Sequence, residues 1–315
     1  MHDYTFRTSQ TVYYRGNAMD VSRFCYFHPG GVMIKDHLGE DVSLLLKTYR
    51  HSKATYAILK SQFQIDCHDG FVDWSQPIIN QVGSLGSNYE GWIKSPVYRP
   101  LRVFASDWME MQTKTSVSEV ILYWVPISIG LLLESWDRKP TEMSTGTCLD
   151  LFLHTLLVVL GLIKWTLFEY VVHRWIFHAA PPATSPFLIT CHFMAHGVHH
   201  KVPFDADRLL FPLVPASFIA LILYSLYSLY LSSWMAMAVM SGTLAGYVIY
   251  DVTHHFLHYG SPREGSYLYF LKRYHNQHHF KDSTKGFGIS SNLWDDLLSS
   301  SQSVDPLPFT LKWHD

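Results

Sequence analysis

Four long apolar stretches constrain the fold of this 315-residue chain more than any other feature. They cover residues 117–136, 149–170, 209–231 and 234–250. Each approaches the roughly 20 residues that a helix needs to cross the hydrocarbon core of a bilayer. The composition agrees, because 48% of the residues are hydrophobic and 16% are charged. The sequence therefore predicts four transmembrane helices; the alternative is a soluble protein in which some stretches are core helices.

The connections between the stretches predict the topology. The link between the first two stretches, Asp137–Cys148, is short, and only Ser232 and Ser233 separate the last two. Two such hairpins place both chain ends on one side of the membrane, which also carries most of the Lys and Arg residues. The positive-inside rule makes that side cytosolic. Arg138 and Lys139 on the opposite loop are a mild exception.

Charge and cysteine content exclude some classes of protein. The net charge of −2 gives no electrostatic reason to expect nucleic-acid binding. The four cysteines are widely spaced and form no C-x-x-C pair, so we expect reduced thiols rather than a disulfide framework. The polar N-terminal segment lacks the apolar core of a signal peptide.

Histidines are concentrated in the second half of the chain. Twelve of the 19 lie between His173 and His279, and ten of these form four closely spaced groups. Imidazole is a common ligand of zinc and iron, and helix residues three or four apart share a face. Ten ring nitrogens are too many for one tetrahedral ion, so the pattern predicts two metal ions. The candidate ligands are His173, His178, His196, His199, His200, His254, His258, His275, His278 and His279.

The histidine groups lie next to the predicted membrane ends of the apolar stretches. Metal sites in helix bundles are assembled in this way, from side chains on neighbouring helices. We expect His192 and His255, the two remaining histidines of this region, to support the site or face the surface rather than bind metal. Glu169 and Asp251 could each orient an imidazole by accepting its second N–H, or could pair with a nearby basic side chain.

An N-terminal segment carries a second candidate cofactor site. DVSRFCYFHPGG (Asp20–Gly31) precedes HSKATYAIL (His51–Leu59), and over residues 11–66 the chain resembles cytochrome b5. The resemblance implies a small α+β domain that binds haem b through His28 and His51, although the chain before the motif is short. Two histidine ligands leave no open coordination position, so such a haem carries electrons. The alternative is a b5-like domain that has lost its haem.

The histidine groups and the segments around them resemble the fatty acid hydroxylase/sterol desaturase superfamily of membrane di-metal oxygenases. The resemblance covers almost the whole chain and assigns the ten histidines as metal ligands. It implies a b5-like domain at residues 1–66, a connector at 67–116 and a hydroxylase domain at 117–315. Within this superfamily, the chain most resembles the enzymes that hydroxylate carbon 2 of sphingolipid acyl chains. The segments that carry this resemblance are VDWSQPIINQVGSLG, PVYRPLRVFASD, HHKVPFDADRLLFPLVPAS and KGFGISSNLWDDL.

The resemblance implies a mainly α protein, with a four-helix transmembrane domain and a cytosolic, histidine-rich di-metal cap. Its expected activity is that of a monooxygenase, which uses O₂ and electrons from the b5-like haem to hydroxylate carbon 2 of fatty acyl chains within or destined for ceramides. We expect two iron ions, which zinc can replace in purified protein because imidazole sites hold zinc tightly. The expected electron source is an NAD(P)H-dependent cytochrome b5 reductase or P450 reductase, and the expected location is the endoplasmic reticulum membrane.

Two other functions compete with this interpretation. A related lipid desaturase or sterol oxidase would share the histidine spacing, because each begins by breaking a C–H bond. A membrane metal transporter or metal-binding scaffold would place its ligands near the bilayer midplane, whereas these lie at one face. The sequence leaves open the form of the acyl substrate, its chain length, the stereochemistry and the oligomeric state.

Overall fold

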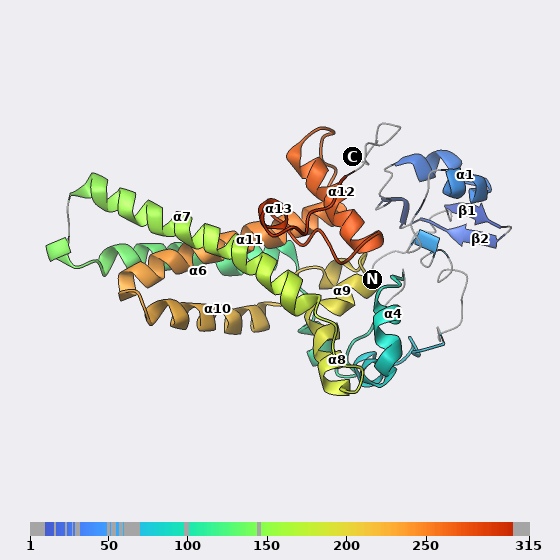
Figure 1. The fold of residues 1–315 in the computed structure, drawn as a ribbon, viewed down its shortest axis with the longest axis horizontal. Helices are drawn as coiled ribbons and strands as arrows, with labels where there is room; N and C mark the ends of the chain where they lie inside the picture. The colour runs from blue at the N-terminus through green and yellow to red at the C-terminus, as the bar shows by residue number, and fades with distance from the viewer. Residues whose placement is uncertain are drawn as a thin grey trace, which may run out of the picture.

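Helices dominate the computed structural model of this chain, in which one two-stranded sheet lies near the N-terminus of the described part. A small α+β unit is followed along the chain by short helices and then by a bundle of long helices. The histidine-bearing segments lie at the end of this bundle that is closer to the α+β unit (Figure 1). The predicted fold class is therefore confirmed. The structure describes residues 10–15, 17–22, 24–26, 28, 32–48, 51, 55–56, 59, 70–97, 101–143 and 146–304.

The N-terminal unit is built on a β-hairpin. Strand β1 (Thr11–Tyr14) pairs antiparallel with β2 (Asn17–Asp20), and Val12 lies opposite Met19. Directly opposed residues share one face of a sheet, and both side chains are buried under the helices of this unit. Those helices are η1 (Phe24–Tyr26), η2 (Val32–His37) and α1 (Ser43–Thr48). The predicted boundary between residues 66 and 67 lies outside the described residues.

A second apolar core joins the connecting region to the helix that precedes the second histidine group. Trp92 and Ile78 of the connector pack with Ile189 and Phe193 in this core. The helices meet closely, since a Cβ at Gly83 would lie 2.9 Å from the Pro186 carbonyl oxygen. The connector contains α3 (Ile79–Val82), η3 (Gly83–Asn88), α4 (Tyr89–Ile93) and α5 (Asp107–Met111), and the partner helix is α8 (Pro186–His192).

Four helices in the described part of the chain are long and apolar enough to cross a membrane. Helix α11 lies at the centre and packs against the other three. The apolar segment of α11 is 67% buried inside the protein, whereas the apolar segments of the other three helices are at most 17% buried. The outer helices therefore present apolar side chains outward, as expected for a lipid-facing surface. The four helices are α6 (Val117–Asp137), α7 (Thr147–Val172), α10 (Leu213–Ser228) and α11 (Ser233–Tyr259).

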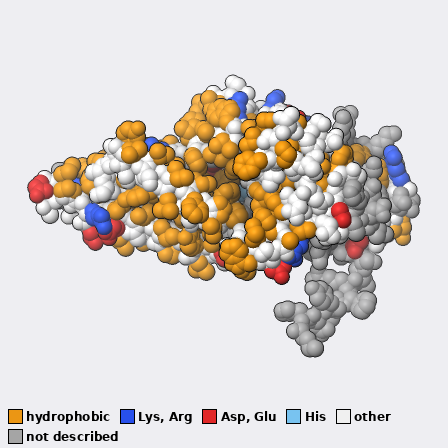
Figure 2. Space-filling view, turned by 90° about the horizontal axis from the view of Figure 1, so that it is seen from below, with side chains coloured by type: hydrophobic (Ala, Val, Ile, Leu, Met, Phe, Trp, Pro, Cys, Tyr) orange, Lys and Arg blue, Asp and Glu red, His pale blue; other side chains and the backbone are white. Residues whose placement is uncertain are grey.

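The surface of the bundle is consistent with a membrane. Figure 2 shows hydrophobic side chains over most of the visible face of the bundle, with charged side chains at the tip farthest from the N-terminal unit. Phe152, Phe218 and Leu221 are among the large apolar residues that remain exposed. A continuous apolar surface of this kind marks an interaction with lipid or with another apolar partner.

Small residues allow the two longest helices to meet backbone to backbone. A Cβ on Gly161 of α7 would lie 2.1 Å from the Val239 carbonyl oxygen. A Cβ on Gly242 of α11 would lie 2.0 Å from the Val158 carbonyl oxygen. Only glycine allows this approach, which is a common way for helices to pack inside a membrane. Ser128 adds a hydrogen bond between α6 and α11, with its hydroxyl 2.9 Å from the Ser241 carbonyl oxygen.

The histidine-bearing elements continue from one end of the bundle. Helix α7 runs directly into a π-helical turn, and α11 continues beyond the predicted apolar stretch to Tyr259. The remaining elements are η4 (Thr141–Met143), η5 (His173–Phe177), η6 (Phe193–Gly197), α9 (Val198–Lys201), η7 (Ala206–Arg208), α12 (Tyr267–Phe280) and α13 (Leu293–Leu297).

Candidate metal centre and haem site

The structure brings the ten predicted histidines together in two groups of five. Within each group one ring nitrogen per residue lies within 4.8 Å of the others. These are the potential metal-holding groups among the residues that the structure describes. The first group is His173, His178, His196, His200 and His278. The second group is His199, His254, His258, His275 and His279.

The ring nitrogens within each group face one another at ligand spacing. In the first group, the His173 Nε2 lies 3.1 Å from the His196 Nε2 and 3.2 Å from the His178 Nε2. In the second, the His275 Nε2 lies 2.9 Å from the His258 Nε2. Metal–imidazole bonds are about 2.0–2.1 Å long, so two ligands at right angles around one ion have nitrogens about 3 Å apart. The spacing thus fits one ion in each group.

A π-helical turn explains how the first pair of histidines meets. His173 and His178 are five residues apart, and on an α-helix of 3.6 residues per turn they would point about 140° apart. The chain instead forms the π turn η5, in which the His178 amide donates to the His173 carbonyl oxygen at 3.1 Å. This wider turn brings both rings to one side, and such turns are frequent at functional sites. The expectation that helical spacing alone aligns each pair was therefore wrong for this pair.

Two long helices supply most of the second group. His254 and His258 lie four residues apart on α11, and His275 and His279 lie four apart on α12. Each pair shares a helix face, as the sequence predicted. The fifth member, His199, comes from the short helix α9.

Adjacent histidines divide between the two groups. His199 belongs to the second group and His200 to the first, while His278 belongs to the first and His279 to the second. Consecutive residues on a helix point in different directions, so each HH pair reaches both sites. Helices α9 and α12 thereby hold the two groups side by side.

Backbone carbonyls orient several of the rings. The His173 Nδ1 donates to the Phe287 carbonyl oxygen at 2.5 Å, and the His278 Nδ1 donates to the Lys285 carbonyl oxygen at 2.8 Å. A proton on Nδ1 leaves the Nε2 lone pair free to bind a metal ion. Each of these two rings therefore presents the unprotonated Nε2 that a metal ligand needs.

Among the described residues, Glu169 and Asp251 have neither of the two roles that the sequence left open, orienting an imidazole or pairing with a basic side chain. Glu169 instead accepts hydrogen bonds from Trp165 Nε1 at 3.1 Å, from the Ser290 amide at 3.1 Å and from the Ser290 hydroxyl at 2.5 Å. Neither carboxylate oxygen of Asp251 has a histidine partner within the described part of the chain. The Glu169 carboxylate therefore fixes the loop after α12 to α7.

A buried carboxylate supports the loop that orients His173. Asp295 is fully buried and accepts hydrogen bonds from the amides of Phe287 at 3.0 Å and Gly288 at 2.7 Å, and from the Ser300 hydroxyl at 2.7 Å. These bonds fix the Phe287 carbonyl, which in turn accepts from His173. Nothing in the local sequence pattern indicates this role of Asp295, because it depends on backbone amides of a folded loop.

Burial keeps the imidazoles neutral. Loss of solvent contact lowers the pKa of His199 and His275 well below the usual value, and neighbouring histidines lower it further. Burial also lowers the pKa of the His278 ring to about 4, despite the opposing hydrogen bond to Lys285. A metal ligand must be unprotonated, so these rings are in the binding form at neutral pH.

The two leftover histidines lie outside both groups. The Tyr89 hydroxyl donates to the His192 Nδ1 at 2.6 Å, and burial lowers the pKa of this ring. The His255 ring instead lies beside Tyr259, with centres 5.0 Å apart. Neither belongs to a group of potential ligands among the described residues.

Two cavities reach the histidine groups. The larger, about 580 Å³, is mainly apolar and is lined by Trp108, Met194 and Phe211 beside His199 and His254. It opens where the connector meets the membrane helices.

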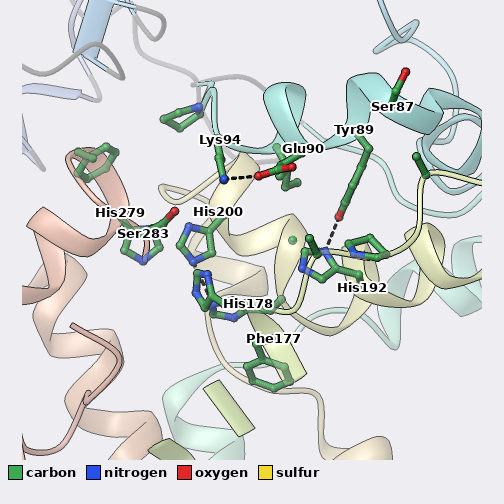
Figure 3. Close-up of a pocket in the computed structure, with 18 of the residues that line it drawn as sticks. Ser87, Tyr89, Glu90, Lys94, Phe177, His178, His192, His200, His279 and Ser283 are labelled. Carbon is green, nitrogen blue, oxygen red and sulfur yellow. Dashed lines mark hydrogen bonds and ion pairs between the residues drawn. The ribbon is translucent and has the colours of Figure 1, made fainter. Parts of the chain in front are cut away.

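The smaller cavity, about 280 Å³, reaches His178, His200 and His279. Figure 3 shows these rings beneath a polar rim, where Lys94 donates to Glu90 at 2.6 Å. The metal centre is therefore accessible from an apolar and from a polar cavity.

The N-terminal unit brings the two predicted haem ligands together. The rings of His28 and His51 have centres 6.2 Å apart and planes 25° apart. Since metal–imidazole bonds are about 2 Å long, two rings that bind one iron from opposite sides have centres roughly 6 Å apart. The His51 Nδ1 donates to the Leu46 carbonyl oxygen at 3.1 Å, which leaves its Nε2 free. The pair fits the axial ligands of a haem.

The fold and these two sites define a class: a membrane metalloprotein with a haem-binding domain of the cytochrome b5 type. The family model described as fatty acid hydroxylase matches residues 158–300. The model described as cytochrome b5-like heme/steroid binding domain matches residues 4–76. The chain belongs to the fatty acid hydroxylase family and carries an N-terminal cytochrome b5-like domain, so the resemblance seen in the sequence is confirmed.

Relatives cover most of the chain. It is 43% identical to the fatty acid 2-hydroxylase of Rattus norvegicus, over 78% of this chain and 68% of that protein. Identity to the fatty acid 2-hydroxylase of Mus musculus is 37%, over 88% and 87% of the two chains. A dihydroceramide fatty acyl 2-hydroxylase of Arabidopsis thaliana is 37% identical, over 74% of this chain and 94% of that protein.

A solved structure shares the fold. Full-length scs7p, in which only the hydroxylase domain is visible, superposes with a TM-score of 0.67 and 27% sequence identity, and the match covers 82% of this chain and 93% of that chain. With the relatives, this match identifies the chain as a hydroxylase enzyme of a membrane.

Proposed function

We propose that this chain is a membrane di-iron monooxygenase that hydroxylates carbon 2 of fatty acyl chains within, or destined for, ceramides and other sphingolipids. The proposal rests above all on one observation: the larger apolar cavity reaches members of both histidine groups. A lipid chain held there would present one carbon to both metal positions. Two of the relatives, a fatty acid 2-hydroxylase and a dihydroceramide fatty acyl 2-hydroxylase, support the same substrate class.

The apolar cavity suits an acyl chain. Trp108, Met109 and Leu210 line it, and His196 and His199 lie at its inner end. Cavities that bind small molecules are mostly apolar, with few polar groups that fix orientation. The smaller cavity offers hydrogen-bonding side chains, among them Lys94 and Ser283, for the carbonyl-bearing end of the lipid. Carbon 2 is next to that carbonyl, so it would lie beside the histidines.

The chain itself prepares the metal centre. Neutral imidazoles point Nε2 inward, and the Phe287 and Lys285 carbonyls hold two of these rings in the correct orientation. Most of these rings are buried, which limits their contact with bulk water. Iron, when bound, would supply the redox chemistry that O₂ activation needs and that zinc lacks.

Electrons would enter through the b5-like domain. His28 and His51 would hold a haem b whose coordination is complete, which suits an electron carrier. We propose an NAD(P)H-dependent cytochrome b5 reductase or P450 reductase as the donor. Tethering the haem to the hydroxylase replaces a bimolecular encounter with an intramolecular one.

Domain limits and location complete the proposal. The haem domain would comprise residues 1–66, the connector 67–116 and the hydroxylase domain 117–315. The basic residues near the histidine groups favour a cytosolic position for that end of the bundle. We propose that the protein resides in the endoplasmic reticulum membrane with both termini in the cytosol.

Lipid mass spectrometry tests the function. The chain and its His199→Ala, His28→Ala and His255→Ala variants would be expressed in a host whose own 2-hydroxylase is deleted. We expect 2-hydroxy acyl sphingolipids from the unmodified chain and the His255→Ala control, and none from His199→Ala or His28→Ala. Product from His28→Ala would mean that electrons arrive without the haem. Unsaturated lipids or oxidised sterols, in place of 2-hydroxy lipids, would refute carbon 2 hydroxylation.

A further inference from the structure

One residue of the hydroxylase part packs against the N-terminal domain and against the helix that carries two ligand candidates of the second histidine group. This residue, Phe204, lies in the turn of residues 202–205 that follows α9. Phe204 packs against an apolar core whose other described members lie between Val12 and Leu59. Its ring also stacks on Phe280 of α12, the residue that follows His279. Phe204 therefore lies between the surroundings of the two candidate cofactor sites.

A continuous series of aromatic contacts runs between these two sites. The ring of His28 lies 5.6 Å from that of Phe24, centre to centre, and Phe24 lies 5.6 Å from Phe204. Phe204 stacks on Phe280, with centres 5.7 Å apart and planes 13° apart. Phe280 lies 5.8 Å from the ring of its neighbour, His279. Every step from a haem ligand candidate to a metal ligand candidate is a direct ring contact.

The series reaches the second histidine group before the first. His279, beside Phe280, belongs to the second group. In the described residues, rings of the first group join the series through rings of the second, as where His200 lies on His279 with centres 4.4 Å apart. Outside the two groups, the ring contacts of the first group lead to Phe177 and Phe287. The arrangement therefore distinguishes the two metal positions.

Resting on the function proposed above, we propose that Phe204 and Phe280 form the electron entry point of the metal centre, and that the second histidine group is reduced first. In each event one electron leaves the ferrous haem iron, which becomes ferric, and converts a ferric ion of the second group to ferrous. The external reductase then returns the haem to the ferrous state. Electron tunnelling weakens steeply across gaps, so packed rings couple the sites better than a solvent-filled space. Phe204 is thus a positioning residue that also docks the haem domain.

The test follows haem oxidation in the full-length holoenzyme. Pre-reduced protein is mixed with O₂ and lipid substrate, and the haem absorption band reports the rate at which the haem loses its electron. The variants are Phe204→Leu, Phe280→Leu and the ring-preserving Phe204→Tyr. Phe270→Leu is the matched control, because Phe270 is another α12 ring that contacts Tyr267 and Tyr274 outside the series.

We expect Phe204→Leu and Phe280→Leu to slow haem oxidation roughly tenfold or more, which corresponds to about 1.4 kcal/mol in the barrier. Phe204→Tyr and Phe270→Leu should oxidise close to the unmodified rate, and the haem potential and metal content should not change. Unchanged rates in both leucine variants, or a chain that binds no haem, would overturn the proposal. Equal slowing by Phe204→Leu and Phe204→Tyr would also overturn it, because the ring would then have no role.

A dithionite experiment separates this proposal from the proposed function. Dithionite reduces haem and metal ions directly, so one turnover with O₂ should then give equal 2-hydroxy product in all variants. Product in this assay together with unchanged haem oxidation in the leucine variants would overturn only the entry point. No product, even from the unmodified holoenzyme, would overturn the hydroxylase function, and with it the inference that rests on it.

Discussion

The contact between α7 and α11 provides the sharpest test of the bundle. A Cβ on Gly242 would lie 2.0 Å from the Val158 carbonyl oxygen, whereas ordinary contact begins at 3.4 Å, a shortfall of 1.4 Å. The neighbour is backbone and cannot rotate away, so Gly242→Ala must force the helices apart. Overpacking typically costs about 1–3 kcal/mol, and a backbone clash favours the upper value.

The expected result is a large loss of thermal stability. About 3 kcal/mol lowers the melting temperature of a unit of 150–250 residues by roughly 6–12 °C. Because α7 leads to His173 and α11 carries His254, metal content should fall as well. Both are measurable on detergent-purified protein, by thermal unfolding and by elemental analysis.

Gly130→Ala is the matched control for this substitution. Gly130 lies within α6, and a Cβ there would meet nothing within 4 Å. Replacing an exposed helical glycine by alanine should be neutral or stabilise the helix by up to about 1 kcal/mol. If Gly242→Ala and Gly130→Ala had the same melting temperature, the close backbone contact would not exist in the folded protein.

Three further substitutions probe the supports of the site. Asp295→Asn should weaken metal binding by roughly 10- to 100-fold in a chelator competition, whereas Asp296→Asn, at an exposed position, should leave the affinity unchanged. Equal metal affinities of the two variants would exclude a role of Asp295 in supporting the loop that orients His173. Glu110→Ala removes a buried carboxylate that pairs with Arg208 and accepts from the Val103 and Phe104 amides. Because Asp205 still neutralises Arg208, the free energy of unfolding should fall by about 1–3 kcal/mol, and an unchanged value would contradict burial of the pair. His192→Ala should retain both metal ions by elemental analysis, and loss of an ion would make His192 a ligand.

The sequence predicted features that depend on local pattern. Helix length follows from apolar runs, and the pairs His254/His258 and His275/His279 follow from helical spacing. The HPGG motif and the later His51 predicted a paired site whose rings do lie together. Helix length and the two helical pairs are determined within one segment, and the haem pair follows from two short motifs, so these residues alone are informative.

Features that depend on contacts between distant segments could not be predicted in the same way. The π turn at His173 changes the helical phase, and the five-residue spacing alone does not show whether the two rings meet at one site. The orienting carbonyls of Lys285 and Phe287 belong to a loop, and backbone groups leave no trace in side-chain identity. The division of His199 and His200 between groups depends on where α11 and α12 lie relative to α9. Tertiary packing decides all three.

Oxygen labelling would show whether the hydroxyl oxygen comes from O₂ and which carbon receives it. The full-length protein, loaded with iron and haem and supplied with a reductase, would convert a ceramide or acyl substrate under heavy-isotope O₂. We expect a hydroxyl on carbon 2 that carries one heavy oxygen atom, and no product from the His199→Ala variant. A hydroxyl with oxygen from water, a hydroxyl at another carbon or a double bond in its place would contradict a metal-centred carbon 2 monooxygenase.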